Sequence, residues 1–267
     1  MLEIIDTHCH LYSDKFDADR PEAIQRAIDQ GVKKILLPNV DLQTINGLHA
    51  LMLEYPQVCF GMMGLHPCDV KEDYDAVLDQ MEILLDQHPY VAIGEIGIDL
   101  YWDKTTQDIQ EKAFLRQVEW ALQRNLPIAI HTRNATQLTI ELLKPFKGKG
   151  LKGVFHCFSE SYELATEILK LEGFYLGLGG VLTYKNNHNL REVMEKISLE
   201  HVILETDSPY LPPEPNRGKR NEPAYTRLVA EKLAEVKNTT LGNVAEITTA
   251  NAKSLFSLDS VETFKSL

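Results

Sequence analysis

Eight short apolar runs recur along the chain, and a longer segment with apolar residues at helical spacing follows each of them. The runs are nearly continuous in apolar residues rather than alternating, which is typical of strands in a parallel sheet that helices cover. The predicted strands are, in chain order, residues 2–5, 34–38, 58–65, 90–97, 128–131, 154–156, 174–181 and 202–207. This repeat limits the chain to a few α/β architectures.

An eightfold alternation of strand and helix over 267 residues favours one α/β domain, a (β/α)8 TIM barrel, over an open doubly wound sheet. The sequence has no GxGxxG or GxxxxGK[ST] motif, which argues against a nucleotide-binding fold. We expect the barrel to occupy residues 1–257 and a C-terminal tail to follow at residues 258–267.

Composition points to an ordinary globular protein, with 44% hydrophobic and 25% charged residues. The chain shows neither a basic-then-apolar leader nor an apolar run of about 18 residues. Its four cysteines form no CxxC pair and no disulfide-like framework. We therefore expect a reduced, cytoplasmic protein that contacts no membrane and acts as a monomer.

The first predicted strand leads into His8-Cys9-His10. Side chains of an extended segment repeat with period two, so His8 and His10 should point the same way. Two imidazoles on one backbone make half of a divalent-metal site. Taken alone, the pair could equally well close a strand end by hydrogen bonding to backbone and water.

Further candidate ligands follow the other strands. In a TIM barrel the carboxyl ends of all strands meet at the face that carries the active site. At these ends the sequence places His8, His10, His66, Glu95, His131, His156 and Asp207. The histidines that fall in predicted helices or loops, to which we assign no chemistry, are His49, His88, His188 and His201. This sorting favours a metal centre over scattered polar groups.

Four histidines and two carboxylates are more ligands than one tetrahedral ion needs. A carboxylate can bridge two ions about 3.5–4 Å apart, and Glu95 is the natural bridge. Gly94 and Gly97 beside it are expected to leave room for metal or substrate close to the backbone. Asp207 can accept a proton from the attacking water, so Glu95 and Asp207 are the candidate catalytic carboxylates.

Seven sequence blocks resemble those of the TatD-type metal-dependent deoxyribonucleases, within the wider amidohydrolase-like superfamily. They are Asp6-Thr7-His8-Cys9-His10, Gly64-Leu65-His66-Pro67, Gly94-Glu95-Ile96-Gly97-Ile98-Asp99, His131-Thr132-Arg133, His156-Cys157-Phe158-Ser159, Glu205-Thr206-Asp207-Ser208-Pro209-Tyr210 and Arg217-Gly218-Lys219-Arg220-Asn221-Glu222-Pro223. The blocks run in order along nearly the whole chain, and the last is particular to this family.

The resemblance implies a barrel that hydrolyses phosphodiesters with two divalent ions, typically as a 3′-to-5′ exonuclease on single-stranded or frayed DNA ends. One ion would be held by His8, His10 and Asp207, the other by His131 and His156, and both by Glu95, with Asp207 as general base. The implied substrate contacts are His66, Arg133, Ser159, Arg217, Arg220 and Asn221. Glu160 departs from the family pattern, in which a small residue is frequent after Ser159.

The net charge of −12 is the wrong sign for holding DNA by bulk electrostatics, so a polyanion would need local basic groups or metal. Arg133 is placed for bidentate phosphate contact, or else for a surface ion pair. The loop after the eighth strand adds Arg217, Lys219 and Arg220 at the active face. Tyr101 and Trp102, after the fourth strand, could stack a base or could pack beneath a loop.

Two other functions stay open at this point. One is hydrolysis of an amide, lactone or aminoacyl ester on the same scaffold, because one fold hosts many chemistries. The other is a binding protein that kept a metal site without turnover. Carboxylates and water suit Mg²⁺ or Mn²⁺, whereas a histidine-rich site also holds Zn²⁺, so the working metal is left undecided between them.

Overall fold

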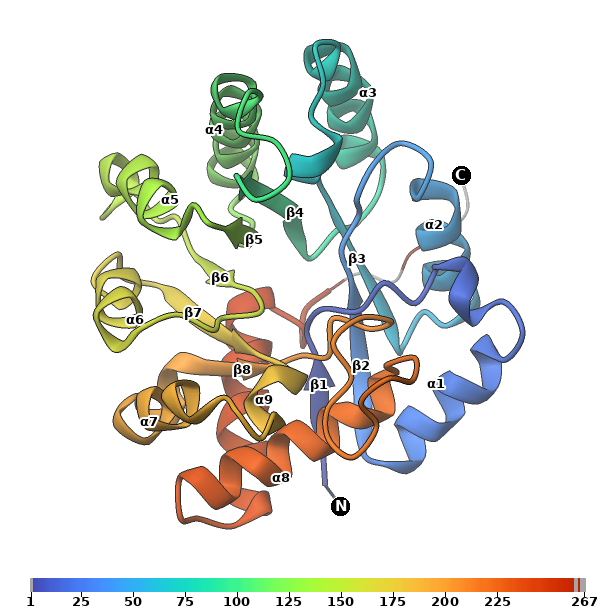
Figure 1. Ribbon diagram of the computed structural model, residues 1–267. Coiled ribbons are helices and arrows are strands. Elements are labelled where there is room, and N and C mark those ends of the chain that lie inside the picture. Colours follow the sequence, from blue (N-terminus) through green and yellow to red (C-terminus); the bar gives the residue numbers. More distant parts are fainter. Residues whose placement is uncertain (1, 262–263, 265–267) are drawn as a thin grey trace.

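The computed structural model describes residues 2–261 and 264, and its centre is one sheet of eight parallel strands in the order β1 to β8 (Figure 1). The strands are β1 Ile4–Asp6, β2 Val32–Leu37, β3 Cys59–Met63, β4 Ala92–Asp99, β5 Ile128–Arg133, β6 Gly153–Phe155, β7 Phe174–Leu178 and β8 Val202–Leu204. Each strand pairs in parallel with the next, as the apolar runs predicted.

The last strand returns to the first and nearly closes the sheet into a barrel. The backbone N–H of Thr7 donates to the Leu204 carbonyl at 3.0 Å, and the backbone N–H of Asp207 donates to the His8 carbonyl at 2.9 Å. Cys9 and Ser208 add a parallel bridge beyond the strand ends. The predicted (β/α)8 barrel is therefore confirmed.

Helices surround the barrel on the outside (Figure 1). They are α1 Arg20–Asp29, α2 Ile45–Glu54, α3 Tyr74–Gln87, α4 Gln107–Arg124, α5 Thr136–Leu143, α6 Tyr162–Leu169, α7 His188–Lys196, α8 Thr226–Val236 and α9 Leu241–Phe256. Short 3₁₀ turns lie at Asp14–Phe16, Pro67–Asp69, Lys144–Phe146, Gly180–Thr183, Leu199–His201 and Pro223–Tyr225. No helix of the described chain combines the length and apolar character needed to cross a membrane.

Two apolar clusters show which way the strand side chains point. The larger cluster joins outward-facing strand residues such as Ile128 and Ile130 to the helices. The smaller one fills the inside of the barrel with Ile5, Leu36, Phe60, Met62, Ala92, Ala129, Val154 and Ile203, and the end of α9 closes it. Side chains alternate along a strand, so the positions two residues beyond Ala129, Val154 and Ile203 also face inward. Those positions carry His131, His156 and Glu205.

Of the predicted tail, Leu258 is buried at the base of the barrel, and Val261 packs against the inner cluster. Phe264 stacks on the imidazole of His88, with 4.9 Å between ring centroids. Tail positions 262, 263 and 265–267 lie outside the described residues.

Candidate metal centre

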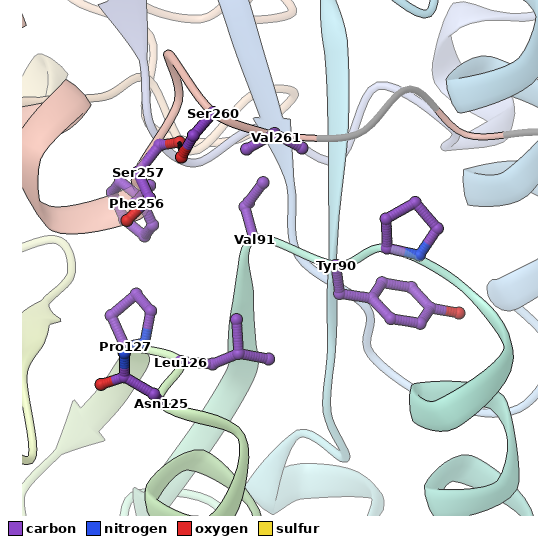
Figure 2. Close-up of a pocket in the computed structure, with 10 residues that line it drawn as sticks. Tyr90, Val91, Asn125, Leu126, Pro127, Phe256, Ser257, Ser260 and Val261 are labelled. Atoms are coloured by element: carbon purple, nitrogen blue, oxygen red, sulfur yellow. Dashed lines mark hydrogen bonds between the residues drawn. The ribbon is translucent and has the colours of Figure 1, made fainter.

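A pocket of about 200 Å³ opens at the amino ends of β4 and β5, at the foot of the barrel (Figure 2). Val91 and Pro127, which directly precede those strands, line it together with Phe256. Its ten lining residues include no acidic, basic, histidine or cysteine side chain. Conserved chemistry in such barrels sits at the opposite end, where the predicted ligands of this chain meet.

The carboxylate of Glu95 lies at the centre of that opposite end, 2% exposed. Its Oε2 atom lies 3.1 Å from His8 Nε2 and 3.5 Å from His10 Nε2. Asp207 Oδ1 approaches the same two nitrogens, at 3.9 and 3.5 Å. The first histidine pair and both predicted catalytic carboxylates therefore converge at one point.

The other oxygen of Glu95 faces a different set of histidines. Oε1 lies 3.0 Å from His131 Nδ1, 3.0 Å from His156 Nε2 and 3.5 Å from His66 Nε2. The two sets touch where the ring of His8, from the first set, stacks on the ring of His156, from the second, with centroids 3.8 Å apart. One carboxylate thus presents each of its oxygens to a separate group of imidazoles.

Regular alternation along β4 does not account for the inward position of Glu95. Ile93 and Ile96 both pack outward against the helices although they are three residues apart, and the β4–β5 register shifts between them. Because Ala92 faces inward, an undistorted strand would turn Glu95 outward. The irregularity brings Glu95, Gly97 and Asp99 to the inside.

Tyr12 sets the tautomer of His10. The Tyr12 hydroxyl donates to the Pro38 carbonyl at 2.6 Å, so it accepts from His10 Nδ1, which lies 2.7 Å away. A proton on Nδ1 leaves the lone pair of Nε2 free, and Nε2 is the atom that faces Glu95 and Asp207. This arrangement is that of a metal-ligating histidine with an outer hydrogen-bond partner.

His131 has a carboxylate as its outer hydrogen-bond partner, and a carboxylate also lies beside the outer nitrogen of His156, although no hydrogen bond forms there. Asp99 Oδ2 lies 2.9 Å from His131 Nε2, which leaves Nδ1 facing Glu95. Glu205 Oε1 lies 3.4 Å from His156 Nδ1, which leaves Nε2 facing Glu95. Gly177 on β7 makes room for Glu205, because a Cβ there would overlap the carboxylate. Both carboxylates are buried.

The hydrogen bond of His66 places its proton on the nitrogen that faces Glu95, the opposite of the arrangement at His10. Its Nδ1 accepts from the backbone N–H of Cys68 at 3.1 Å, so the neutral ring carries its proton on Nε2. The atom that faces Glu95 is then an N–H donor rather than a free lone pair. His66 lies within the cluster, but its tautomer suits a contact to an anionic substrate oxygen better than metal ligation.

The charges in the cluster stabilise one another. Burial by itself would raise the pKa of Glu95, but the surrounding imidazoles, His156 foremost, hold this pKa well below its usual range. Burial also opposes ionisation of Asp207, but the contact with His10 and the charges of His156 and His8 together outweigh it and lower the pKa of the carboxyl. Both carboxylates are therefore ionised at neutral pH, as metal ligation requires.

The donor set fits divalent metal ions. With the other ring nitrogen engaged by Tyr12 or Asp99, His10 Nε2 and His131 Nδ1 are the atoms that would ligate a metal beside the buried carboxylates, and borderline N/O sites of this kind suit Zn²⁺, Mn²⁺ and similar ions. Among the described residues, His8, His10 and Glu95 place ligand atoms within 4.8 Å of one another. Buried polar atoms left without a hydrogen bond are His8 Nδ1, His156 Nδ1 and Glu205 Oε2. Residues His8, His10, Glu95, His131, His156 and Asp207 would hold the ions.

Asn221, implied as a substrate contact by the sequence blocks, is engaged within the fold. It is fully buried, and its amide donates to the carbonyls of Thr206 at 2.8 Å and Tyr210 at 2.6 Å. Asp207, between them, has a left-handed backbone with φ 57°. Asn221 therefore holds the turn that presents Asp207.

Arg220 is also engaged in holding the fold. Its guanidinium pairs with Asp19 at 2.6 Å, donates to the Lys15 carbonyl at 2.8 Å and lies over the Phe16 ring. These contacts tie the loop after β8 to the segment before α1, so Arg220 does not reach the centre. Arg217 is exposed and stacks on Tyr184, 3.9 Å from the ring centroid. It lines a surface pocket of about 430 Å³ at the mouth of the barrel.

Two further predicted contacts lie at the rim. Ser159 is exposed after β6, and the neighbouring Glu160 accepts a hydrogen bond from Thr136 at 3.0 Å. Arg133 is exposed at the end of β5, with its guanidinium 3.7 Å from the centroid of Tyr101. The structure leaves Ser159, Arg133 and Arg217 accessible from the mouth.

Gly94 and Gly97 make room for the neighbouring strand rather than for metal or substrate, which corrects the expectation from the sequence. A Cβ at Gly97, where φ is 148°, would overlap the carbonyl oxygen of His131. A Cβ at Gly94 would lie 2.7 Å from the Ala129 side chain. The two glycines let β4 approach β5 closely enough for Glu95 to face His131.

Sequence reasoning missed three residues that orient ligands: Tyr12, Asp99 and Glu205. For two of them a signal existed. Asp99 lies four residues after Glu95 on the same strand, and Glu205 lies two residues before Asp207. Both stand at a spacing that keeps side chains on one face. Tyr12 offers no such signal, because its role depends on the Pro38 carbonyl of the next strand.

Comparison with known proteins agrees with this centre. The chain matches the family described as TatD related DNase over residues 5–257. It is 40% identical to YabD of Bacillus subtilis (strain 168), named an uncharacterized metal-dependent hydrolase, over 96% of this chain and all of YabD. It is 32% identical to the Escherichia fergusonii protein named 3′-5′ ssDNA/RNA exonuclease TatD, over 96% of this chain and 99% of that protein.

The crystal structure of YjjV, a TatD homologue from Escherichia coli K12, has the same fold, with a TM-score of 0.89 and 32% identity. The match covers 95% of this chain and 98% of YjjV. The resemblance seen in the sequence blocks is confirmed by the family match over nearly the whole chain. The chain belongs to the TatD-related DNase family of metal-dependent hydrolases.

Proposed function

We propose that this hydrolase cleaves phosphodiester bonds of single-stranded DNA from the 3′ end, with two divalent ions shared by Glu95. The observation that carries the proposal is the division of the Glu95 carboxylate, with Oε2 toward His8 and His10 and Oε1 toward His131 and His156. A carboxylate with a separate imidazole group at each oxygen is suited to bridging two ions.

The chain's own groups would divide the work of hydrolysis. Bound divalent ions supply charge to the non-bridging phosphate oxygens and acidify water. Asp207, kept ionised by its imidazole neighbours, would accept the proton of the water that attacks phosphorus. His66 would donate its Nε2–H to a phosphate oxygen, and Arg133 would contact the next phosphate from the rim. The bond from phosphorus to the leaving oxygen breaks as the new one forms.

The choice of a nucleic acid is supported by the names of relatives and by the mouth of the barrel. A relative 32% identical to this chain is named a 3′-5′ ssDNA/RNA exonuclease. The net charge of −12 opposes general attraction of a polyanion, so accessible cations matter. Arg133 and Arg217 supply such cations at the mouth. We propose Mg²⁺ or Mn²⁺ as the working ions, because carboxylates and water favour them, with Zn²⁺ as a tight competitor.

The test is degradation of a 5′-labelled single-stranded oligonucleotide in EDTA and after adding back Mg²⁺, Mn²⁺ or Zn²⁺. We expect a ladder that shortens from the 3′ end, disappears with chelator, and falls at least about 100-fold in Asp207→Asn. Glu160→Gln, which changes a carboxylate at the rim, should leave the ladder intact. Blocking the 3′ end of the strand tests the polarity of cleavage. An RNA of the same sequence tests the preference for deoxyribose or ribose.

Metal stoichiometry provides an independent test of the shared carboxylate. Glu95→Gln keeps the shape of the side chain but removes its charge, so we expect loss of both ions in a calorimetric titration and no cleavage. Retention of two ions by this variant would disprove the bridge. No cleavage by the wild-type protein under any metal, with metal binding intact, would point to another hydrolysable bond.

A further inference from the structure

Two exposed aromatic rings stand at the mouth of the barrel beside the metal centre. Tyr101 and Trp102 follow β4 after Leu100, and they are 52% and 71% exposed. Trp102 is the most exposed large hydrophobic residue in the described part of the chain. Tryptophan is strongly buried on average, so an indole left in water at an active face indicates a contact surface.

The position of these rings is tied to the metal centre through one carboxylate. Asp99 Oδ1 accepts from the backbone N–H of Tyr101 at 2.9 Å and of Trp102 at 3.4 Å. Its other oxygen lies 2.9 Å from Nε2 of His131. The turn that carries the rings therefore stands at a set distance from a metal ligand.

Arg133 lies close over the Tyr101 ring and farther from the Trp102 ring. Its guanidinium lies 3.7 Å from the centroid of Tyr101 and 5.4 Å from that of Trp102. The two rings stand edge to face, 4.9 Å apart at 90°. Tyr101 and Arg133 thus contact the indole of Trp102 and brace it, yet Trp102 as a whole remains 71% exposed. The cation beside them offers N–H groups to a phosphate.

We propose that Trp102, braced by Tyr101 and Arg133, is a stacking platform for a nucleobase of the substrate strand. This inference rests on the proposed function and narrows it. A base stacks on the indole, and the phosphate of that nucleotide contacts Arg133. From there the strand continues to the metal centre, since His131 lies on β5 two residues before Arg133. Bases inside a duplex keep their faces stacked on each other, so the platform selects single-stranded nucleic acid.

Binding to base-bearing and base-free strands tests the platform directly. The full chain in EDTA is titrated with a short thymidine oligonucleotide and with a strand of equal length made of tetrahydrofuran abasic residues. Tryptophan fluorescence reports the contact, because the second tryptophan, Trp120, is 2% exposed. Fluorescence anisotropy of end-labelled strands follows the variants that lack Trp102.

We expect Trp102→Ala to weaken binding of the thymidine strand about 5- to 150-fold and binding of the abasic strand hardly at all. Trp102→Phe, which keeps an aromatic face, should recover most of the affinity. The matched control is Ile83→Ala, which removes an exposed side chain from the outer helix α3. Equal losses on both strands, no loss on either, or no binding by the wild-type chain would each overturn the platform.

Cleavage of the same thymidine strand after adding Mn²⁺ separates this inference from the function on which it rests. If the wild type cleaves the strand and Trp102→Ala binds it as tightly as the wild type does, the platform is overturned and the nuclease proposal stands. Base-dependent binding by a chain that cleaves no strand under any metal would overturn the nuclease proposal, while the platform would stand as a binding site.

Discussion

The hydroxyl of Tyr12 lies 2.7 Å from His10 Nδ1 and donates its own hydrogen bond to the Pro38 carbonyl, so it accepts one from the imidazole. His10 is thereby held with a free lone pair on Nε2, next to Glu95 and Asp207. Asp99 orients His131 in a similar way, and the carboxylate of Glu205 lies 3.4 Å from the outer nitrogen of His156. The metal centre is therefore built from ligands whose protonation is set by groups one layer further out.

Tyr12→Phe removes the acceptor from His10 and leaves its ring nearly the same packing. We expect metal affinity to fall about 10- to 100-fold at the site that includes His10, as is typical for outer partners of ligating histidines. Titration of the chelator-stripped protein with Mn²⁺ or Zn²⁺ measures this. Tyr210→Phe is the matched control, because Tyr210 lies edge-on to His10 without a hydrogen bond to it among the described residues. Equal affinities of Tyr12→Phe and wild type would show that the hydroxyl does not set the ligand.

Glu205→Gln replaces the buried carboxylate beside His156 Nδ1 with a neutral amide. Without the negative charge the imidazole is a weaker metal ligand, so we expect about 10- to 100-fold lower metal affinity and a matching loss of activity at limiting metal. Saturating metal should restore much of the rate, because Glu205 does not touch the substrate. A rate that stays low at saturating metal would assign Glu205 a more direct part in the reaction.

Gly97→Ala tests the close approach of β4 and β5. An added Cβ would overlap the His131 carbonyl at a backbone φ of 148°, which side-chain-bearing residues rarely adopt. We expect a loss of more than about 3 kcal/mol in the free energy of unfolding, measured by urea denaturation. Gly148→Ala is the control, because a Cβ there meets nothing within 4 Å despite a positive φ, so only the backbone cost remains. Similar losses in the two variants would refute the steric argument.

His49 should make stability depend on pH at the foot of the barrel. Its Nε2 lies 2.6 Å from the Tyr90 hydroxyl, and burial, helped by His88, lowers the pKa of His49 to about 4. The unfolded chain takes up this proton near pH 6.5 and the folded chain only near pH 4, so stability is full above pH 6.5 and falls as the pH drops toward 4. Partial exposure limits the loss to about 1–2 kcal/mol.

The measurement is urea denaturation of the wild type and His49→Gln between pH 8 and pH 4. The difference between the two free energies of unfolding should shift in favour of His49→Gln across that window, because the glutamine has no proton to take up. His201→Gln, at an exposed histidine, should track the wild type at every pH. A constant difference between His49→Gln and the wild type would contradict the assignment.

The eight apolar runs, with one histidine or carboxylate after most of them, determined the barrel and the membership of the metal cluster. The physical reason is that parallel strands joined by helices must bring their carboxyl ends to one face, whatever the details of packing. Ligands in a strand or directly after one, such as His131 and His156, therefore needed no knowledge of distant contacts. Regular alternation along a strand suffices to turn them inward.

The tertiary structure alone decided how those ligands are used. The irregularity in β4 turns Glu95 inward, against simple alternation, because β4 must lie close against β5 at Gly97. The tautomer of His10 depends on a carbonyl of another strand, and that of His66 on a backbone N–H in its own turn. Asn221 looked like a substrate contact in the sequence but is buried under the turn of Asp207. Such roles arise from hydrogen bonds between groups that meet only after folding, and no period along the chain encodes them.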